Sequence, residues 1–184
     1  PGMTVNRFCS SGLETINIGA AQIMTGQSEF VIAGGTETMT MVPMGGLRYL
    51  PNPTLAREHP DYLTNMGLTA ETLVVRDGIT REAQDEFACH SHRKAVEAIA
   101  AGRYAGEIVP VMAQLPGVDK KGRPVTDMVE FKVDEGPRAD TTAEALAKLK
   151  PAFKQGGTVT AGNSSQMSDG AAAVLLTTPE LAAE

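Results

Sequence analysis

The chain has 184 residues, with 16 Lys and Arg against 22 Asp and Glu, so its formal net charge is −6. This mild acidity argues against a general nucleic-acid binder, which needs a basic face, and a hydrophobic fraction of 42% argues against intrinsic disorder. Two cysteines are too few for a disulfide framework, and no run of 18 apolar residues is present to span a bilayer.

The first 35 residues predict a strand, a helix and a second strand. Residues 3–8 are β-prone, and Ser11 with Glu14 fits the capping box that opens a helix. Apolar residues then recur at three- and four-residue spacing until Gly26, which suits a left-handed helix end. Residues 30–33 are wholly apolar, as in a strand buried on both faces of a mainly parallel sheet. The segment therefore predicts one βαβ unit, with Cys9 at the junction of strand and helix.

The stretch 36–157 combines proline-containing loops with helices. Thr80 predicts the cap of a helix that Gly102 ends, and a short strand at 107–111 and a charged turn at 117–124 follow. A capping box at 141–144 opens a shorter helix. The inward face of the longer helix is predicted to comprise Ala83, Phe87, Ser91, Ala95, Ala98 and Ile99. A long insertion of this kind usually forms a lid or a binding lobe.

The end of the chain is again sheet-like. Gly170 precedes an apolar strand at 171–176, and residues 178–184 predict the start of a helix that is cut short. We therefore expect an α/β fold: a mainly parallel sheet with helices on both faces and a long insertion. Because the chain begins with Pro1, and strand-like sequence follows almost at once, we expect both ends to be cuts through a larger protein.

Cys9 is the sharpest candidate for chemistry. A thiol at a strand-to-helix junction lies near unpaired backbone N–H groups and the positive end of the helix dipole. Both favour a thiolate, and the same amides can hold an oxyanion that forms on a thioester carbonyl. The alternative is that Cys9 is a small hydrophobic residue at a crowded turn, which is the usual fate of a free cysteine.

Other candidate groups are weaker. Cys89, His90 and His92 supply at most two ligands on one helix face, which does not close a zinc site. No glycine pair has the spacing of a phosphate-binding loop, and His59 is predicted to be a surface residue. Five basic residues of the late insertion can meet an anionic ligand or can be ordinary solvated charges: Lys132, Arg138, Lys148, Lys150 and Lys154.

Seven segments, in order and with family-like spacing, resemble the thiolases, which cleave or form 3-oxoacyl-CoA. The first surrounds Cys9 and resembles the nucleophile motif of the family, and the others continue along essentially the whole chain. They are VNRFCSSGL at 5–13, AGGTETM at 33–39, MGLTAE at 66–71, DEGPR at 134–138, LKPAF at 149–153, GTVTAGN at 157–163 and SDGAAA at 168–173.

The resemblance implies a thiolase-like layered fold and roles for five residues. Residues 1–39 would be part of the N-terminal core, 40–167 a loop domain that binds coenzyme A, and 168–184 a return strand with the start of a truncated helix. Cys9 would take the acyl group as a covalent thioester, with its own N–H in an oxyanion hole. Arg138 matches a residue near the nucleotide end of coenzyme A, Phe153 and Ser165 match residues of the pantetheine channel, and Met66 matches one near the acyl end. Coenzyme A and acyl-CoA would be substrates, with no tightly bound cofactor and no metal.

The chain departs from the family pattern at two positions and by one absence. Asn65 stands where some biosynthetic thiolases have histidine, which favours a degradative 3-ketoacyl-CoA thiolase over an acetoacetyl-CoA thiolase. Gln166 stands where the acetoacetyl type usually has glycine. The family's Asn-Glu motif, activating histidine and second cysteine are absent, so we expect them outside this sequence and expect residues 1–184 alone to be inactive.

Other functions and properties follow from the same comparison. A non-catalytic module that binds coenzyme A or lipid stays open, whereas the loop-domain matches argue against a ketosynthase. Family membership implies a homodimer or homotetramer, with the strand at 30–35 pairing across the dimer. We expect neither nucleic-acid binding nor a membrane span. The default compartment is the bacterial cytosol, and mitochondrion and peroxisome stay open.

Overall fold

The structure, a computed structural model, describes residues 2–183, and the chain divides into two compact units. The first comprises Pro1–Leu50 and Met167–Glu184, and the second comprises Pro51–Gln166. The first unit thus extends to Leu50, whereas the sequence placed the start of the insertion at residue 40. Within the described residues no helix combines the length and the apolar character that crossing a membrane requires.

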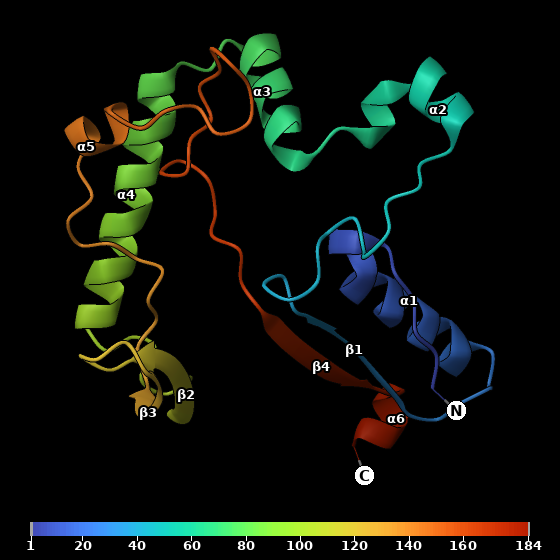
Figure 1. The fold of residues 1–184 in the computed structure, drawn as a ribbon. Coiled ribbons are helices and arrows are strands. Elements are labelled where there is room, and N and C mark those ends of the chain that lie inside the picture. The colour runs from blue at the N-terminus through green and yellow to red at the C-terminus, as the bar shows by residue number, and fades with distance from the viewer. Residues whose placement is uncertain (1, 184) are drawn as a thin grey trace. The chain divides into compact units, whose positions relative to one another are not determined.

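The first unit is a helix packed on a pair of strands. The 3₁₀ turn η1 (Phe8–Ser10) leads into α1 (Ser11–Met24), and β1 (Val31–Glu37) lies antiparallel to β4 (Gly170–Leu176), followed by α6 (Pro179–Ala182). Figure 1 shows α1 running alongside this pair. Gly19 permits the close approach, because a Cβ there would lie 3.0 Å from Val31 Cγ1 and 2.9 Å from Leu176 Cδ1.

The second unit is mainly helical, with one hairpin. Four helices and a 3₁₀ turn are α2 (Pro53–Glu58), η2 (Pro60–Leu63), α3 (Met66–Asp77), α4 (Arg81–Ala100) and α5 (Ala143–Ala147). Side-chain oxygens of Asn52, Asn65, Thr80 and Thr142 accept N–H bonds and cap four of these helices. The antiparallel hairpin joins β2 (Val111–Val118) to β3 (Pro124–Phe131) beyond the C-terminal end of α4, and α5 packs beside α4 (Figure 1).

Several local predictions are confirmed. The helix that Thr80 caps is present, Gly26 has φ +71° just beyond α1, and β4 begins at Gly170. The α/β class is confirmed as well, but both strand pairs in residues 2–183 are antiparallel, where we expected mainly parallel strands. An apolar run records a preference for burial and not a strand direction, and the chain returns beside β1 from the opposite end.

Other predictions about elements are wrong. Residues 3–7 form no strand, because they pair with neither β1 nor β4, the only strands of their unit among the described residues. The strand expected at 107–111 is absent up to residue 110: residue 107 ends a turn, 108–110 have no regular structure, and β2 begins at Val111. The strands β2 and β3 flank the charged turn. The strand at 30–33 is not covered on both faces within this chain, since Ile32 is 77% exposed.

The inward face of α4 was predicted wrongly at Ala83, Phe87 and Ser91, which are exposed, whereas the other three predicted residues, Ala95, Ala98 and Ile99, are half-buried. Phe87 is 78% exposed, whereas Asp85 is buried and Arg81 is half-buried. This face is polar because α5 and residues 158–163 offer it hydrogen-bond partners, as described below. Apolar periodicity cannot mark a face that packs through polar groups.

Candidate active site

The turn that carries Cys9 is held in an unusual backbone conformation. Phe8 has φ +50° and is the only residue other than glycine with a positive φ in residues 2–183. Asn6 Oδ1 accepts the Phe8 N–H at 2.8 Å, and Ser11 Oγ donates to the Phe8 carbonyl at 2.7 Å. Ser11 Oγ also accepts the Arg7 N–H at 2.8 Å. These bonds fix the backbone on both sides of Phe8 and leave the next residue, Cys9, exposed.

The helix start differs from the predicted capping box. The N-cap is Ser10 and not Ser11, and no side chain caps this end, because the Ser11 hydroxyl braces the turn instead. Glu14 does not reach back to the amides, and its carboxylate lies 3.7 Å from the Arg7 guanidinium. The Cys9 N–H donates no hydrogen bond within residues 2–183, so it is available to an oxyanion beside the thiol.

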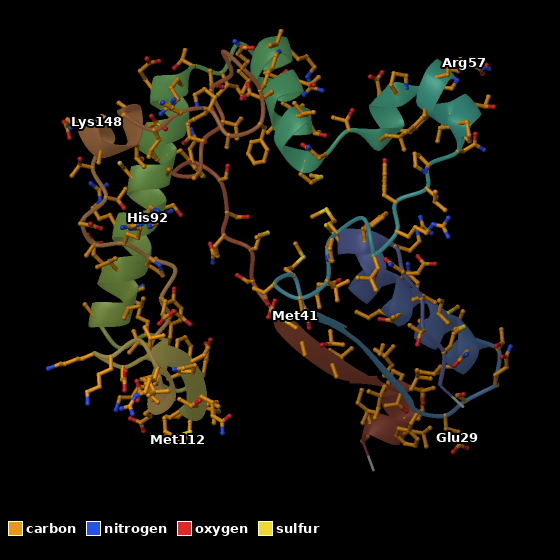
Figure 2. The ribbon with its side chains drawn as sticks, viewed as in Figure 1. Glu29, Met41, Arg57, His92, Met112 and Lys148 are labelled. Carbon is orange, nitrogen blue, oxygen red and sulfur yellow. The ribbon has the colours of Figure 1, made fainter. Side chains whose placement is uncertain are left out.

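Cys9 borders a cavity of about 590 Å³ that lies entirely within the first unit. Its walls are the Cys9 turn, the end of β1, the loop 39–46 and the start of β4. Met41, labelled in Figure 2, belongs to this loop. The lining residues are mostly small or apolar: Asn6, Phe8, Cys9, Ser11, Gly12, Gly35, Thr36, Glu37, Met39, Val42, Pro43, Met44, Gly46 and residues 168–172. A thiol at the edge of an apolar cavity can meet the carbonyl of an acyl chain.

A carboxylate anchors the loop 39–46 to the start of β4. Asp169 Oδ1 accepts the Thr40 N–H at 3.0 Å, and Oδ2 accepts the Thr40 hydroxyl at 2.6 Å. These two bonds, the hydroxyl bond foremost, hold the pKa of Asp169 below the ordinary value of an aspartate. Outside the lining of this cavity, the Thr15 hydroxyl donates to the Gly34 carbonyl at 3.2 Å and ties α1 to β1.

The residues expected to contact coenzyme A lie in the second unit. Met66 is the first residue of α3 and is 63% exposed, and Phe153, 43% exposed, lies against the next residue, Gly67. A Cβ on Gly67 would overlap the Phe153 ring, so glycine is required for this contact. The structure thus places Phe153 beside the residue that follows Met66.

The other two expected contacts, Arg138 and Ser165, are both exposed. The Arg138 guanidinium lies 3.6 Å from Asp140, and the Arg138 N–H donates to His92 Nδ1 at 3.0 Å. His92 points from α4 (Figure 2) and uses Nδ1 as an acceptor for the backbone and not as a metal ligand. Arg138 also borders a second cavity, of about 500 Å³, beside Cys89 on α4.

Sequence reasoning missed the hydrogen bonds that brace the Cys9 turn and the Asp169 anchor. An Asn two residues before the N–H that it accepts is the signature of an Asx-turn, so Asn6 was a readable signal. Thr40 and Asp169 are 129 residues apart and carry no such signal. No group of three or more metal-ligating side chains occurs in the part of the chain that the structure describes.

Comparison with known proteins gives the following similarities. The family model described as "Thiolase, N-terminal domain" matches residues 1–180. A 3-ketoacyl-CoA thiolase of Bacillus subtilis is 49% identical, and the alignment covers 96% of this chain and 45% of that protein. An acetyl-CoA acetyltransferase of Pseudomonas aeruginosa is 45% identical over 96% of this chain and 46% of its own.

A solved structure agrees with the sequence relatives. The crystal structure of the dimeric peroxisomal thiolase of Saccharomyces cerevisiae has a TM-score of 0.75 and 38% identity, and it covers 97% of this chain and 44% of its own. The chain therefore spans less than half the length of each of these three proteins.

Proposed function

Because this chain belongs to the thiolase family, we propose that the protein containing it transfers acyl groups between carbon and the sulfur of coenzyme A. In the degradative direction the Cys9 thiolate attacks the 3-oxo carbon of a 3-oxoacyl-CoA. The bond between C2 and C3 breaks, its electron pair stays on C2, and a proton there completes acetyl-CoA. The thiol of a second coenzyme A then takes the acyl group from Cys9 and gives up its proton, which restores the enzyme.

The observation that carries this proposal is the turn around Cys9. The exposed Cys9 thiol directly follows Phe8, whose backbone is in the left-handed region. The Cys9 N–H donates no hydrogen bond among the described residues, and an apolar cavity lies beside the thiol. A pure binding module has no need of a nucleophile held in this way. Among the described residues the cavity lining holds the carboxylates of Glu37 and Asp169 but no histidine, so the base for Cys9 comes from outside this lining.

Coenzyme A is proposed as a substrate, with the second unit as the loop domain that holds it. Met66 and Phe153 support this role because both are exposed and Phe153 lies against Gly67, the residue after Met66. Arg138 offers an exposed cation for a phosphate. No tightly bound cofactor is proposed.

The preferred direction is proposed to be degradative, because Asn65 stands where some biosynthetic thiolases have histidine. The alternative is an acetyl-CoA acetyltransferase, which is the name of the P. aeruginosa relative. Turnover of 3-oxoacyl-CoA substrates of increasing chain length distinguishes the two. A homodimer is the proposed assembly, as in the yeast structure, and the bacterial cytosol is the proposed compartment.

An acyl adduct on Cys9 tests the proposal directly. The full-length protein is incubated with acetyl-CoA and its intact mass is measured, with Cys9→Ala and Cys89→Ala as a matched pair. We expect one acetyl group in the wild type and in Cys89→Ala, and none in Cys9→Ala. No adduct, or an adduct that persists in Cys9→Ala, would favour the non-catalytic binding module.

A further inference from the structure

Two buried carboxylates in the second unit have no part in the chemistry assigned to Cys9. Glu71 on α3 and Asp85 on α4 are each only 4% exposed. A buried carboxylate is costly unless it is hydrogen-bonded or paired. The groups that each carboxylate binds therefore indicate what it holds in place.

Glu71 accepts hydrogen bonds from two consecutive backbone amides. Its Oε1 accepts the N–H of Thr158 and that of Val159, both at 2.8 Å. A Cβ on Gly157 would overlap the Glu71 carboxylate, so the chain approaches it as closely as a backbone can. Glu71 thereby ties α3 to the turn of residues 157–164, which we call the clamped turn.

Asp85 holds the clamped turn from α4. Its Oδ1 accepts the side-chain N–H of Asn163 at 3.0 Å, and its Oδ2 accepts the Arg81 Nε–H at 2.7 Å. The Asn163 side chain in turn accepts the N–H of Thr160, which is fully buried, at 2.7 Å. The turn is thus fixed on two sides by charge-assisted hydrogen bonds, which are stronger than neutral ones.

The clamped turn positions the segments that carry Phe153 and Ser165. The Ala152 N–H donates to the Val159 carbonyl at 2.9 Å, so the residue before Phe153 is bonded to the turn. At the other end the Ser164 hydroxyl donates to the Thr160 carbonyl at 2.7 Å, directly before Ser165.

Met66 is linked to the same turn through its helix. It begins α3, and Glu71 lies one turn and a half further along that helix. Phe153 also lies against Gly67, next to Met66. Three residues expected to line the coenzyme A site therefore depend on the placement of one turn.

We propose that Glu71 and Asp85 are positioning residues for the pantetheine channel. They do not touch the reacting atoms; they hold the clamped turn, and through it Phe153 and Ser165, in the arrangement that coenzyme A binds. This inference rests on the proposed function, because it takes Met66, Phe153 and Ser165 to be coenzyme A contacts.

The test compares Glu71→Ala, Glu71→Gln and Asp85→Asn in the full-length protein, with Glu82→Gln, an exposed carboxylate on α4, as the control. We expect KM for the coenzyme A substrate to rise about tenfold in Glu71→Ala and less in Glu71→Gln, which keeps one acceptor oxygen. The number of active sites is counted by alkylation of Cys9. We expect kcat per active site to stay within about threefold of wild type.

A second readout separates positioning from loss of folding. An acyl-N-acetylcysteamine thioester lacks the nucleotide and most of the pantetheine, so its acylation of Cys9 should change less than about twofold in the same variants. The Kd of coenzyme A itself, measured by calorimetry in a Cys9→Ala background, should rise in parallel with KM.

The outcomes distinguish the two proposals. An unchanged KM and Kd in folded Glu71→Ala would overturn the positioning role. An equal loss of rate with the coenzyme A substrate and with the acyl-N-acetylcysteamine thioester, without a change in KM, would also overturn the positioning role, because only a structural role would then remain. A wild-type protein that binds coenzyme A but turns over no 3-oxoacyl-CoA would refute the proposed function, while Kd would still decide the role of Glu71.

Discussion

Phe8 occupies the left-handed region of backbone space directly before the candidate nucleophile. That conformation costs a residue with a side chain roughly 1–2 kcal/mol, and strain of this kind is kept where the surroundings enforce it. Asn6 and Ser11 are the enforcing residues here, through hydrogen bonds to the Phe8 N–H and carbonyl. The exposure of the Cys9 thiol is therefore a consequence of backbone geometry at its neighbour.

The strain at Phe8 makes a prediction about stability. Phe8 is 66% exposed, so replacing its ring loses little burial. We expect Phe8→Gly to be more stable than Phe8→Ala by about 1 kcal/mol in urea unfolding, because both lose the ring and only glycine adopts positive φ freely. Equal stability of the two variants would show that the turn relaxes without cost.

Asp169 makes a prediction about pH. Its pKa is lowered in the folded protein by its bonds to Thr40, so these bonds are fully present above the unfolded pKa and are lost as pH falls through the folded one. We expect the Asp169 carboxyl, followed by carbon NMR, to titrate at higher pH in Thr40→Val than in wild type. Thr38→Val, which leaves both bonds to Asp169 intact, is the control, and an unshifted titration in Thr40→Val would contradict the anchor.

At the scale of elements, the close pairing of β1 with β4 forms one wall of the Cys9 cavity. A Cβ on Gly34 would overlap the Ala172 carbonyl and would lie 3.0 Å from Ala173 Cα, whereas Gly35 has open space around its Cα. Adjacent glycines of one strand thus have different roles, and only Gly34 is required by contact with β4.

The two glycines provide a matched pair of variants. We expect Gly34→Ala to lower the free energy of unfolding by about 2 kcal/mol, because the added methyl group forces the strands apart. We expect Gly35→Ala to change it by less than about 0.5 kcal/mol. Urea unfolding of both variants measures the difference, and similar losses would mean that β1 and β4 pair less closely than described.

At the scale of the whole molecule, the sequence supplies the proposed nucleophile but no residue that matches the activating histidine of the family. The described lining of the Cys9 cavity includes no histidine, and the sequence has only three histidines, none of which matches the catalytic motif of the family. His59 lies between α2 and η2, and His90 and His92 lie on α4, in the other compact unit. The nucleophile and the residues that activate it act as a unit, so one alone retains little of the rate.

This arrangement predicts the behaviour of residues 1–184 expressed alone. We expect them to cleave acetoacetyl-CoA at least about 10²-fold more slowly than the full-length protein, because a positioned general base contributes about that factor or more. The full-length Cys9→Ala variant sets the background rate of the assay. Turnover by residues 1–184 at the rate of the full-length protein would show that the described residues contain a base.

The sequence by itself determined the features that adjacent residues control. Thr80 and Gly26 marked helix ends, and the apolar run after Gly170 marked β4. The residues around Cys9 marked the candidate nucleophile. Caps, left-handed glycines and short motifs act over a few residues, so their signals lie close together in the chain.

Only the tertiary structure decided which distant groups meet. It set the antiparallel pairing of β1 with β4, the hydrogen bonds between Thr40 and Asp169, and the hydrogen bonds that Glu71 accepts from the amides of residues 158 and 159. It also turned the polar side of the first turns of α4 inward, where the apolar periodicity had predicted Ala83 and Phe87. The nearest of these partners in the sequence, Asp85 and Asn163, are 78 residues apart, and Thr40 and Asp169 are 129 residues apart. No local pattern encodes such partners, because their meeting depends on how the whole chain folds.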